Sequence, residues 1–358
     1  KYFDFLSSYS AVNQGHGNRK ILRSFIRQAK RLALTSRAFY NSELGDALEY
    51  ITSTFGYDKM LPMNSGAEAV ETAIKICRKW GYEVKKIKEN KAKIVVCDGN
   101  FHGRTISLIS FSSSEKSKKN FGPLTPGFEI IEYNNASALE KILKKDKNIA
   151  GFLVEPIQGE NGVVVPDDGY LSNCKELCEK YNVLFIADEI QTGICRTGKL
   201  LASWHENIKP DLVILGKALS GGFYPVSGVL TSKKIMSIMK VGMHGSTFGG
   251  SPLAGAVSKA AIKYAVDYKL SKKSEVLGKV FRDALWDISK TRKIIKNVRG
   301  KGLLNAIVLD CDLNSKIPWE ICLKLQENGL LAKPTQGNKI RFAPPLVITK
   351  RQLFKAIN

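Results

Sequence analysis

The feature of this 358-residue chain that most restricts its fold is a regular alternation of short apolar runs with helical patterns between residues 58 and about 230. The apolar runs are KIVVCDG, FEIIEY, IAGFLVEPI, VLFIADEI and DLVILGK. Amphipathic helical patterns lie between them, as in residues 67–80 and 170–181. Strands that alternate with helices form a largely parallel sheet covered by helices, so we predict a large α/β domain.

The pattern changes after about residue 250. A long helical stretch from Pro252 leads to NVRGKGLLNAIVLD, a helix in PWEICLKLQENGLL and a strand in KIRFAPPLVI. These segments predict a smaller α+β domain, completed by the N-terminal segment around residues 2–11. We therefore expect a large domain over residues 15–257 and a small domain formed by residues 1–14 and 258–358.

The net charge of +22, from 55 Lys and Arg against 33 Asp and Glu, is high enough to raise the question of a nucleic-acid partner. The lysines nevertheless fall in scattered runs mixed with acidic residues, without a recognition-helix or aromatic-ladder pattern. We predict a solvated Lys-rich surface and no nucleic-acid partner. No apolar run approaches the roughly 20 residues that span a bilayer, so no membrane partner is expected either.

The first residues, KYFDFLSSYS, show neither a signal-peptide nor a transit-peptide pattern. We expect a cytoplasmic protein, with the mitochondrial matrix as the alternative if a transit peptide was removed. The odd number of cysteines, seven, is typical of a reduced intracellular chain. Cys174 and Cys178 lie on one face of a predicted helix, where core packing is favoured over a metal or redox role. The four histidines lack zinc-ligand spacing, so no metal is predicted.

Two residues at the ends of apolar runs are candidates for chemistry. Asp188 ends VLFIAD and Lys217 follows DLVILG, and parallel strands bring their carboxyl ends to one edge of a sheet. A lysine in a closed site has a lowered pKa and becomes a nucleophilic amine, although a lysine that snorkels to solvent is the alternative. A carboxylate at that place suits a protonated pyridine nitrogen, although a helix cap is the alternative.

Two further stretches add possible ligand contacts. MLPMNSGAEAVETAIKICRKW places Asn64, Ser65 and Gly66 before a helix whose free backbone N–H groups suit a phosphate, or which simply begins there. In GNFHGRT, Phe101 can stack on a flat ring and Arg104 can bind a carboxylate through two hydrogen bonds, while an ordinary turn is the alternative.

Taken together and in this order, SGAEA, NFHGRT, VEPIQGE, ADEIQTG, GKALSGG and GSTFGG resemble the class III aminotransferases, fold-type I enzymes that use pyridoxal 5′-phosphate (PLP). The resemblance covers essentially the whole chain. Within that class, FLSSYSAVNQGH, EPIQGENGVVVPDDGYL and NGLLAKPTQGNKIRFAPPLVI are similar to the enzymes whose amino donor is ornithine.

The resemblance implies a PLP site. Lys217 would bind the cofactor as a Schiff base and carry the proton of the reaction, and Asp188 would pair with the pyridine nitrogen. The other cofactor contacts would be Ser65, Gly66 and Ala67 at the phosphate, Phe101 stacked on the ring, Gln191 at the ring hydroxyl, and Thr247 of a neighbouring subunit at the phosphate. A site shared in this way implies a homodimer.

The resemblance also implies two substrates. Tyr9 and Arg104 would hold the α-carboxylate end of L-ornithine, so that its distal amine reaches the cofactor. Arg341 would bind 2-oxoglutarate, and Glu160 would cover Arg341 while ornithine is bound. The products would be glutamate 5-semialdehyde and glutamate. His102 is a departure from ornithine enzymes that carry Trp there, although His is frequent at this place across the wider class.

Other functions stay open at this point. The alternatives are a class III aminotransferase with N-acetylornithine, 4-aminobutyrate or lysine as donor, a fold-type I aminomutase or decarboxylase, and a non-catalytic binding protein of the same fold. The pair of Arg104 and Arg341 with Glu160 argues against the aminomutase and the decarboxylase, and retention of Lys217 argues against the binding protein.

Overall fold

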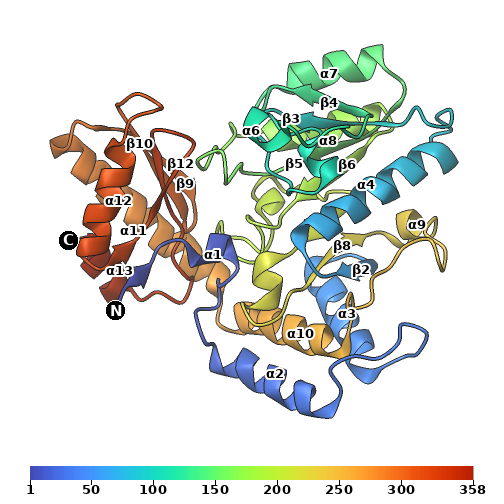
Figure 1. The fold of residues 1–358 in the computed structure, drawn as a ribbon, viewed down its shortest axis with the longest axis horizontal. Coiled ribbons are helices and arrows are strands. Elements are labelled where there is room, and N and C mark those ends of the chain that lie inside the picture. The colour runs from blue at the N-terminus through green and yellow to red at the C-terminus, as the bar shows by residue number, and fades with distance from the viewer. Residues whose placement is uncertain (358) are drawn as a thin grey trace.

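The computed structural model describes residues 1–357 and is built around a seven-stranded sheet of order β2-β8-β7-β6-β5-β3-β4 (Figure 1). Its strands are β2 (Lys59–Met63), β3 (Lys93–Cys97), β4 (Phe128–Ile131), β5 (Ile149–Val154), β6 (Leu184–Asp188), β7 (Leu212–Leu215) and β8 (Ser227–Thr231). The strands from β4 to β7 pair in parallel, whereas β8 runs antiparallel to both β7 and β2. The five predicted strands are confirmed, and the antiparallel edge is an addition.

Helices cover both faces of this sheet, and side chains that alternate along each strand supply both cores. Ile94 and Val96 of β3 pack with α4 (Gly66–Glu83) on one face. Val95 of the same strand packs with α7 (Ala136–Lys145) and α8 (Tyr170–Lys180) on the other face. Cys174 and Cys178 of α8 are buried in this second core, as their spacing predicts, and all seven cysteines are free.

The large part of the chain contains further helical segments. They are α1 (Ser7–Ser10), α2 (Arg19–Arg31), α3 (Ser42–Phe55), α5 (Ile106–Ile109), α6 (Glu115–Lys118), α9 (Lys233–Met236), α10 (Pro252–Asp267) and the 3₁₀ turns η1 (Ala202–Glu206) and η2 (Lys217–Ser220). Helix α10 packs against α2, α3 and η2 (Figure 1). Because α10 spans residue 257, it crosses the predicted limit of the large domain, and the exact domain limits stay a prediction.

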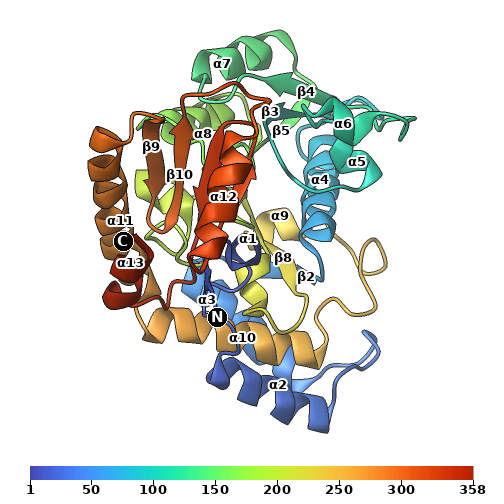
Figure 2. The ribbon, with the colours of Figure 1, turned by 60° about the vertical axis from the view of Figure 1, so that its left-hand side comes forward.

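The C-terminal part forms a separate antiparallel sheet of order β12-β13-β10-β9, visible in Figure 2 beside α11 and α12. Its elements are α11 (Leu270–Thr291), β9 (Ile295–Lys301), β10 (Leu304–Leu309), α12 (Ile317–Glu327), β12 (Lys333–Thr335), β13 (Lys339–Phe342) and α13 (Lys350–Ile357). The N-terminal strand β1 (Phe3–Asp4) pairs in parallel with β11 (Leu330–Leu331), so the first residues do join this part. Within residues 1–357, none of the helices has the length and apolar character needed to cross a membrane.

One fully buried arginine connects the two parts of the chain. Arg196 donates through Nη1 to the backbone oxygens of Leu303, at 3.0 Å, and Pro344, at 2.7 Å. Its Nη2 donates to the side chain of Asn13. Burial lowers the pKa of Arg196 to about 9. The guanidinium therefore joins the loop after β6, the β9–β10 turn, the segment after β13 and the N-terminal segment at one point.

We predict that Arg196→Met lowers the free energy of unfolding by about 3 kcal/mol or more, because it leaves buried oxygens without donors. Chemical denaturation of the purified protein measures the loss. The matched control is Arg31→Met, since Arg31 is exposed and forms a surface ion pair with Glu43, and a change within about 0.5 kcal/mol is expected there. Equal losses of unfolding free energy in both variants would contradict the role of Arg196 in connecting the two parts of the chain.

Candidate active site

A pocket of about 120 Å³ lies at the carboxyl ends of β6 and β7. Asp188 is the last residue of β6, and Lys217 follows β7 after a single glycine, Gly216. The two strands are parallel neighbours, so both side chains reach the same edge of the sheet. The pocket is lined by Gly66, Ala67, Phe101, His102, Gly103, Glu155, Asp188, Ile190, Gln191 and Lys217.

Lys217 enters the pocket from a strained backbone position, with φ at +43°. Burial of the ammonium lowers the pKa of Lys217, and the nearby charges of Glu160 and Asp188 oppose this shift without cancelling it. Among residues 1–357, no side chain forms an ion pair or hydrogen bond with its amine. The amine is therefore buried, with a lowered pKa and no ion-pair partner among residues 1–357, and both features favour its action as a nucleophile.

Asp188 forms a buried pair with His102, whose Nδ1 lies 2.7 Å from Asp188 Oδ2. The second carboxylate oxygen accepts a hydrogen bond from the backbone N–H of Ile190 at 3.1 Å. Burial of the imidazole opposes its protonation, but the hydrogen bond and charge of Asp188 outweigh burial and raise the pKa of His102. His102 thus holds the side chain of Asp188 in place at the edge of the pocket, through a contact that the sequence did not predict.

Glu155 is a second buried carboxyl group of the pocket that the sequence did not single out. Its Oε2 accepts a hydrogen bond from the backbone N–H of Phe101 at 3.0 Å. Burial raises the pKa of Glu155 to about 8. Glu155 therefore fixes the backbone at Phe101, whose ring lines the pocket, and it does so largely without adding a negative charge at neutral pH.

The N-terminus of α4 forms one wall of the pocket. Ser65 and Glu68 make a capping box, in which each side chain accepts a hydrogen bond from the backbone N–H of the other residue. The first-turn N–H groups of Gly66 and Ala67 have no partner within the helix and line the pocket. Gly103 packs closely against this wall, because a Cβ there would lie 2.5 Å from Leu108 Cδ1 and 3.2 Å from Ala67 Cβ.

A network of three side chains closes the pocket toward the small sheet. Arg341 of β13 donates through Nη1 to Glu160 Oε1 at 2.7 Å, and Gln191 Nε2 donates to the same oxygen at 3.0 Å. Burial opposes ionisation of Glu160, but Arg341 outweighs it and lowers the pKa of Glu160. Gly159 is required beside them, since a Cβ there would lie 1.9 Å from Gln191 Oε1.

The remaining predicted residues lie farther out. The ring of Tyr9 lies over Arg341, with 5.1 Å between the guanidinium carbon and the ring centroid. Arg104 is exposed at the rim, 5.8 Å from the centroid of Phe101. Tyr9 therefore belongs to the Arg341 network, whereas Arg104 has an open approach from solvent.

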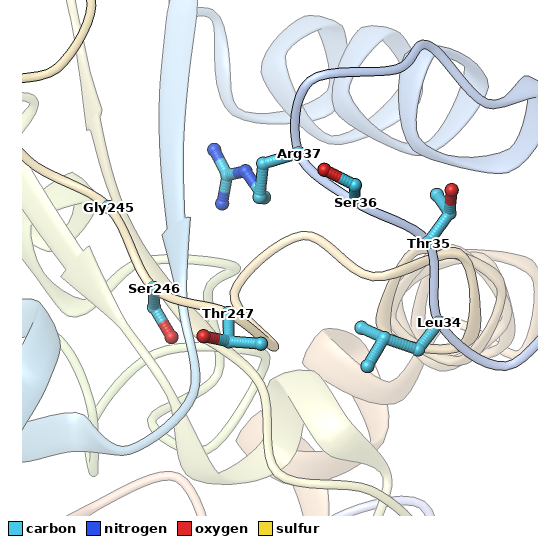
Figure 3. Close-up of a pocket in the computed structure, with 7 residues that line it drawn as sticks. All are labelled: Leu34, Thr35, Ser36, Arg37, Gly245, Ser246 and Thr247. Atoms are coloured by element: carbon cyan, nitrogen blue, oxygen red, sulfur yellow. The ribbon is translucent and has the colours of Figure 1, made fainter.

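Thr247 does not reach the Lys217 pocket of its own chain. It lines a larger pocket of about 800 Å³ between residues 34–37 and residues 245–247, drawn in Figure 3. That pocket contains hydroxyl groups and one cation, Arg37, but no acid, base or nucleophile comparable to Lys217. Within residues 1–357, no group of three or more His, Cys, Asp or Glu side chains is arranged to hold a metal ion.

Comparisons with known proteins agree with this geometry. Residues 1–358 match the family described as aminotransferase class-III. The chain is 56% identical to the mitochondrial ornithine aminotransferase of Drosophila melanogaster, covering 100% of this chain and 82% of that protein. It is 52% identical to the ornithine aminotransferase of Plasmodium falciparum isolate 3D7, covering 99% of this chain and 84% of that protein.

Solved structures give the same grouping. The ornithine aminotransferase of Toxoplasma gondii superposes with a TM-score of 0.97 at 49% identity, covering 99% of this chain and 84% of that chain. The acetylornithine aminotransferase of Elizabethkingia anophelis superposes with a TM-score of 0.91 at 56% identity, covering 99% and 87%. A second structure of the Toxoplasma protein is described as having partial occupancy of PLP at the active site.

The pocket fits PLP by its own chemistry. Lys217 offers an amine that no side chain among residues 1–357 binds, which suits an aldehyde, and Asp188 offers a carboxyl group for a protonated ring nitrogen. Free N–H groups at the start of α4 suit a phosphate. The exposed ring of Phe101 lies where a flat group can stack, and His102 Nε2 is buried without a hydrogen-bond partner among residues 1–357.

We predict that Lys217 in cofactor-free protein is methylated by formaldehyde and cyanoborohydride at neutral pH faster than the exposed Lys272, because a lowered pKa leaves more of the amine uncharged. Mass spectrometry of the peptides measures both rates in one sample. The rate at Lys217 should level off at a lower pH than the rate at Lys272. If Lys217 reacts no faster than Lys272, its amine is not the activated nucleophile described above.

Proposed function

The chain belongs to the class III aminotransferases, and from that premise we propose that its pocket transfers the distal amino group of L-ornithine to 2-oxoglutarate. The products are glutamate 5-semialdehyde and glutamate, formed in two alternating half-reactions. The enzyme depends on PLP, and its curated relatives at 52–56% identity are ornithine aminotransferases. The residue-level proposal rests on the ion pair of Glu160 and Arg341 at 2.7 Å, whose two charges both act on the amine of Lys217.

The residues predicted to contact the cofactor each have a defined task in this proposal. When bound, PLP supplies an aldehyde for the donor amine and a ring that accepts electrons from the substrate carbon. Lys217 Nζ takes the proton from the carbon that bears the transferred amine and later returns a proton. Asp188 would accept a hydrogen bond from the protonated ring nitrogen, and His102 would hold the Asp188 side chain in place through their 2.7 Å contact. Phe101 stacks on the ring, and the N–H groups of Gly66 and Ala67 bind the phosphate, with Ser65 shaping that turn.

Gln191 has a double contact in this scheme. The family resemblance assigns it to the ring hydroxyl, while its amide also connects Glu160 and Arg341 through bonds of 3.0 and 3.2 Å. A group bound at Gln191 is therefore in contact with the same network that closes Arg341. We infer that Gln191 links the cofactor to the substrate-binding end of the pocket.

Glu160 controls which substrate Arg341 binds. Ornithine must present its distal amine, so an open Arg341 would attract its α-carboxylate and bring the wrong amine to Lys217. The ion pair with Glu160, supported by the ring of Tyr9, masks that charge. Exposed Arg104 is then free to bind the carboxylate of ornithine. With 2-oxoglutarate the pair opens, because bidentate carboxylate binding needs a free guanidinium.

We predict that Glu160→Ala favours the glutamate half-reaction and reduces the preference for the distal amine of ornithine by about 1.5–3 kcal/mol, the contribution of one charged hydrogen bond. Single-turnover absorbance spectra with each substrate measure both rates. A ratio of half-reaction rates within about twofold of the parent, less than roughly 0.5 kcal/mol, would remove Glu160 from this role.

A steady-state assay tests which amino donor the enzyme prefers. Ornithine, N-acetylornithine, 4-aminobutyrate and lysine are compared at equal concentration with 2-oxoglutarate, and ornithine is expected to give the highest kcat/KM. Faster turnover of N-acetylornithine would assign the chain to the reaction named for the Elizabethkingia protein. Amino-group migration without 2-oxoglutarate would instead favour an aminomutase.

We further propose a homodimer in which Thr247 of each chain contributes to the phosphate site of the other. Thr247 lies in a pocket apart from the Lys217 pocket of its own chain. Large apolar side chains near it, Phe39, Tyr40, Val241 and Phe248, are exposed and suit an apolar interface with a second copy. For the compartment we propose the cytoplasm, with the mitochondrial matrix as the alternative.

We predict that Lys217→Ala and Thr247→Glu chains, each of low activity alone, regain activity when they are denatured and refolded together. In the mixed dimer, one site receives an intact Lys217 from one chain and an intact Thr247 from the other. The control mixture of Lys217→Ala with Asp188→Asn gains nothing, because each of those sites lacks a residue of its own chain. Equal recovery in both mixtures, or in neither, would contradict the shared site.

A further inference from the structure

Residues 7–10, SSYS, form a left-handed turn that carries Tyr9 to the substrate end of the pocket. Four consecutive residues without a glycine have positive φ, at 49°, 46°, 58° and 75°. For L-residues this region is costly and is normally visited singly, so a run of four relaxes unless other contacts hold it. We call residues 7–10 the left-handed turn.

Two residues hold the start of the turn. Asp4 Oδ1 accepts hydrogen bonds from the backbone N–H groups of Leu6, at 2.8 Å, and Ser7, at 3.0 Å. Buried Ser7 donates through Oγ to the backbone oxygen of Ala343 at 2.6 Å. Because Ala343 follows the end of β13 directly, the bond fastens the turn to the strand that carries Arg341.

The segment after the turn is fastened to the large domain. Asn13 donates to the backbone oxygen of Ile194 at 2.9 Å, and Gln14 donates to that of Ala218 at 3.0 Å. Ala218 is the neighbour of Lys217. The left-handed turn therefore spans the gap between the strand of Arg341 and the turn of Lys217, and the ring of Tyr9 lies over Arg341 as a consequence.

We propose that Asp4 and Ser7 are positioning residues that hold the left-handed turn, and with it Tyr9, so that the enzyme selects the distal amine of ornithine. This inference rests on the proposed function for its substrate. If the anchors are lost, the run relaxes toward right-handed or extended backbone and Tyr9 leaves Arg341. Arg341 is then masked by Glu160 alone, and the α-carboxylate of ornithine can reach it.

The test compares four holoenzymes: the parent, Ser7→Ala, Ser8→Gly and the double variant. Ser7→Ala removes the bond to Ala343. Exposed Ser8 has φ at 46°, and glycine occupies this region without penalty, so Ser8→Gly reduces the need for an anchor. The matched control is Ser258→Ala, which removes a buried bond from Ser258 to the oxygen of Gly255 in α10.

We expect Ser7→Ala to lower kcat/KM for the distal amine of ornithine about tenfold, mainly through KM, while the glutamate half-reaction stays within about twofold. The double variant should recover most of the loss, because glycine adopts the left-handed conformation without the steric penalty that the anchor offsets at Ser8. Ser258→Ala should change neither half-reaction. Equal losses in both half-reactions, or no recovery in the double variant, would overturn the proposal.

Hydrogen exchange provides a second measurement that does not depend on any substrate. The amides of Ala11 and Val12 both donate to the backbone oxygen of Ser7, so their exchange reports the left-handed turn. Ser7→Ala should speed their exchange, and the double variant should slow it again. Unchanged exchange in Ser7→Ala would show that Ser7 is not an anchor.

The two measurements separate the possible failures. If the parent enzyme does not turn over ornithine, the proposed function fails. Hydrogen exchange of the Ala11 and Val12 amides then still shows whether Ser7 holds the turn. If ornithine is turned over and Ser7→Ala speeds exchange without changing the choice of amine, the anchors are structural only and the specificity proposal is wrong.

Discussion

The site depends on keeping the amine of Lys217 buried and without a partner. Desolvation of an ammonium is unfavourable, so the surroundings must lower its pKa without supplying a carboxylate that would bind and neutralise it. Each of the three nearby carboxyl groups has another hydrogen-bond partner. Asp188 pairs with His102, Glu160 pairs with Arg341, and Glu155 accepts a bond from the backbone of Phe101. The pairing of these three acids with other groups is what leaves Lys217 free.

That arrangement requires the two parts of the chain to be fixed relative to each other. Asp188 and Lys217 come from the large sheet, whereas Arg341 comes from β13 of the small sheet. A shift between the sheets would separate Arg341 from Glu160 and release a carboxylate beside Lys217. Buried Arg196, which bonds to Leu303, Pro344 and Asn13, holds the junction where such a shift would begin. A residue remote from the chemistry thus maintains the electrostatics of the pocket.

The sequence predicted what depends on local periodicity. The five parallel strands and the meeting of Asp188 with Lys217 follow from apolar runs and from the geometry of parallel sheets. The antiparallel edge was not predicted, because its outer strand β2 contains Pro62, which weakens a strand pattern. The contact of His102 with Asp188 joins residues 86 positions apart, and no local pattern reports it. The left-handed turn was missed because its residues include no glycine.

Part of the strained backbone of this chain lies where the proposed substrates bind. Lys217 and residues 7–10 all have positive φ, although none is glycine, and all lie along the path from Lys217 to Arg341. Strain of this kind persists only where surrounding contacts determine the conformation, and here Ser7, Asn13 and Gln14 are held by bonds to backbone oxygens on both domains. Such bonds are insensitive to the identity of neighbouring side chains. The placement of Tyr9 and Lys217 is therefore set by the backbone of the fold, while side-chain pairs such as Glu160 with Arg341 are left free to open and close.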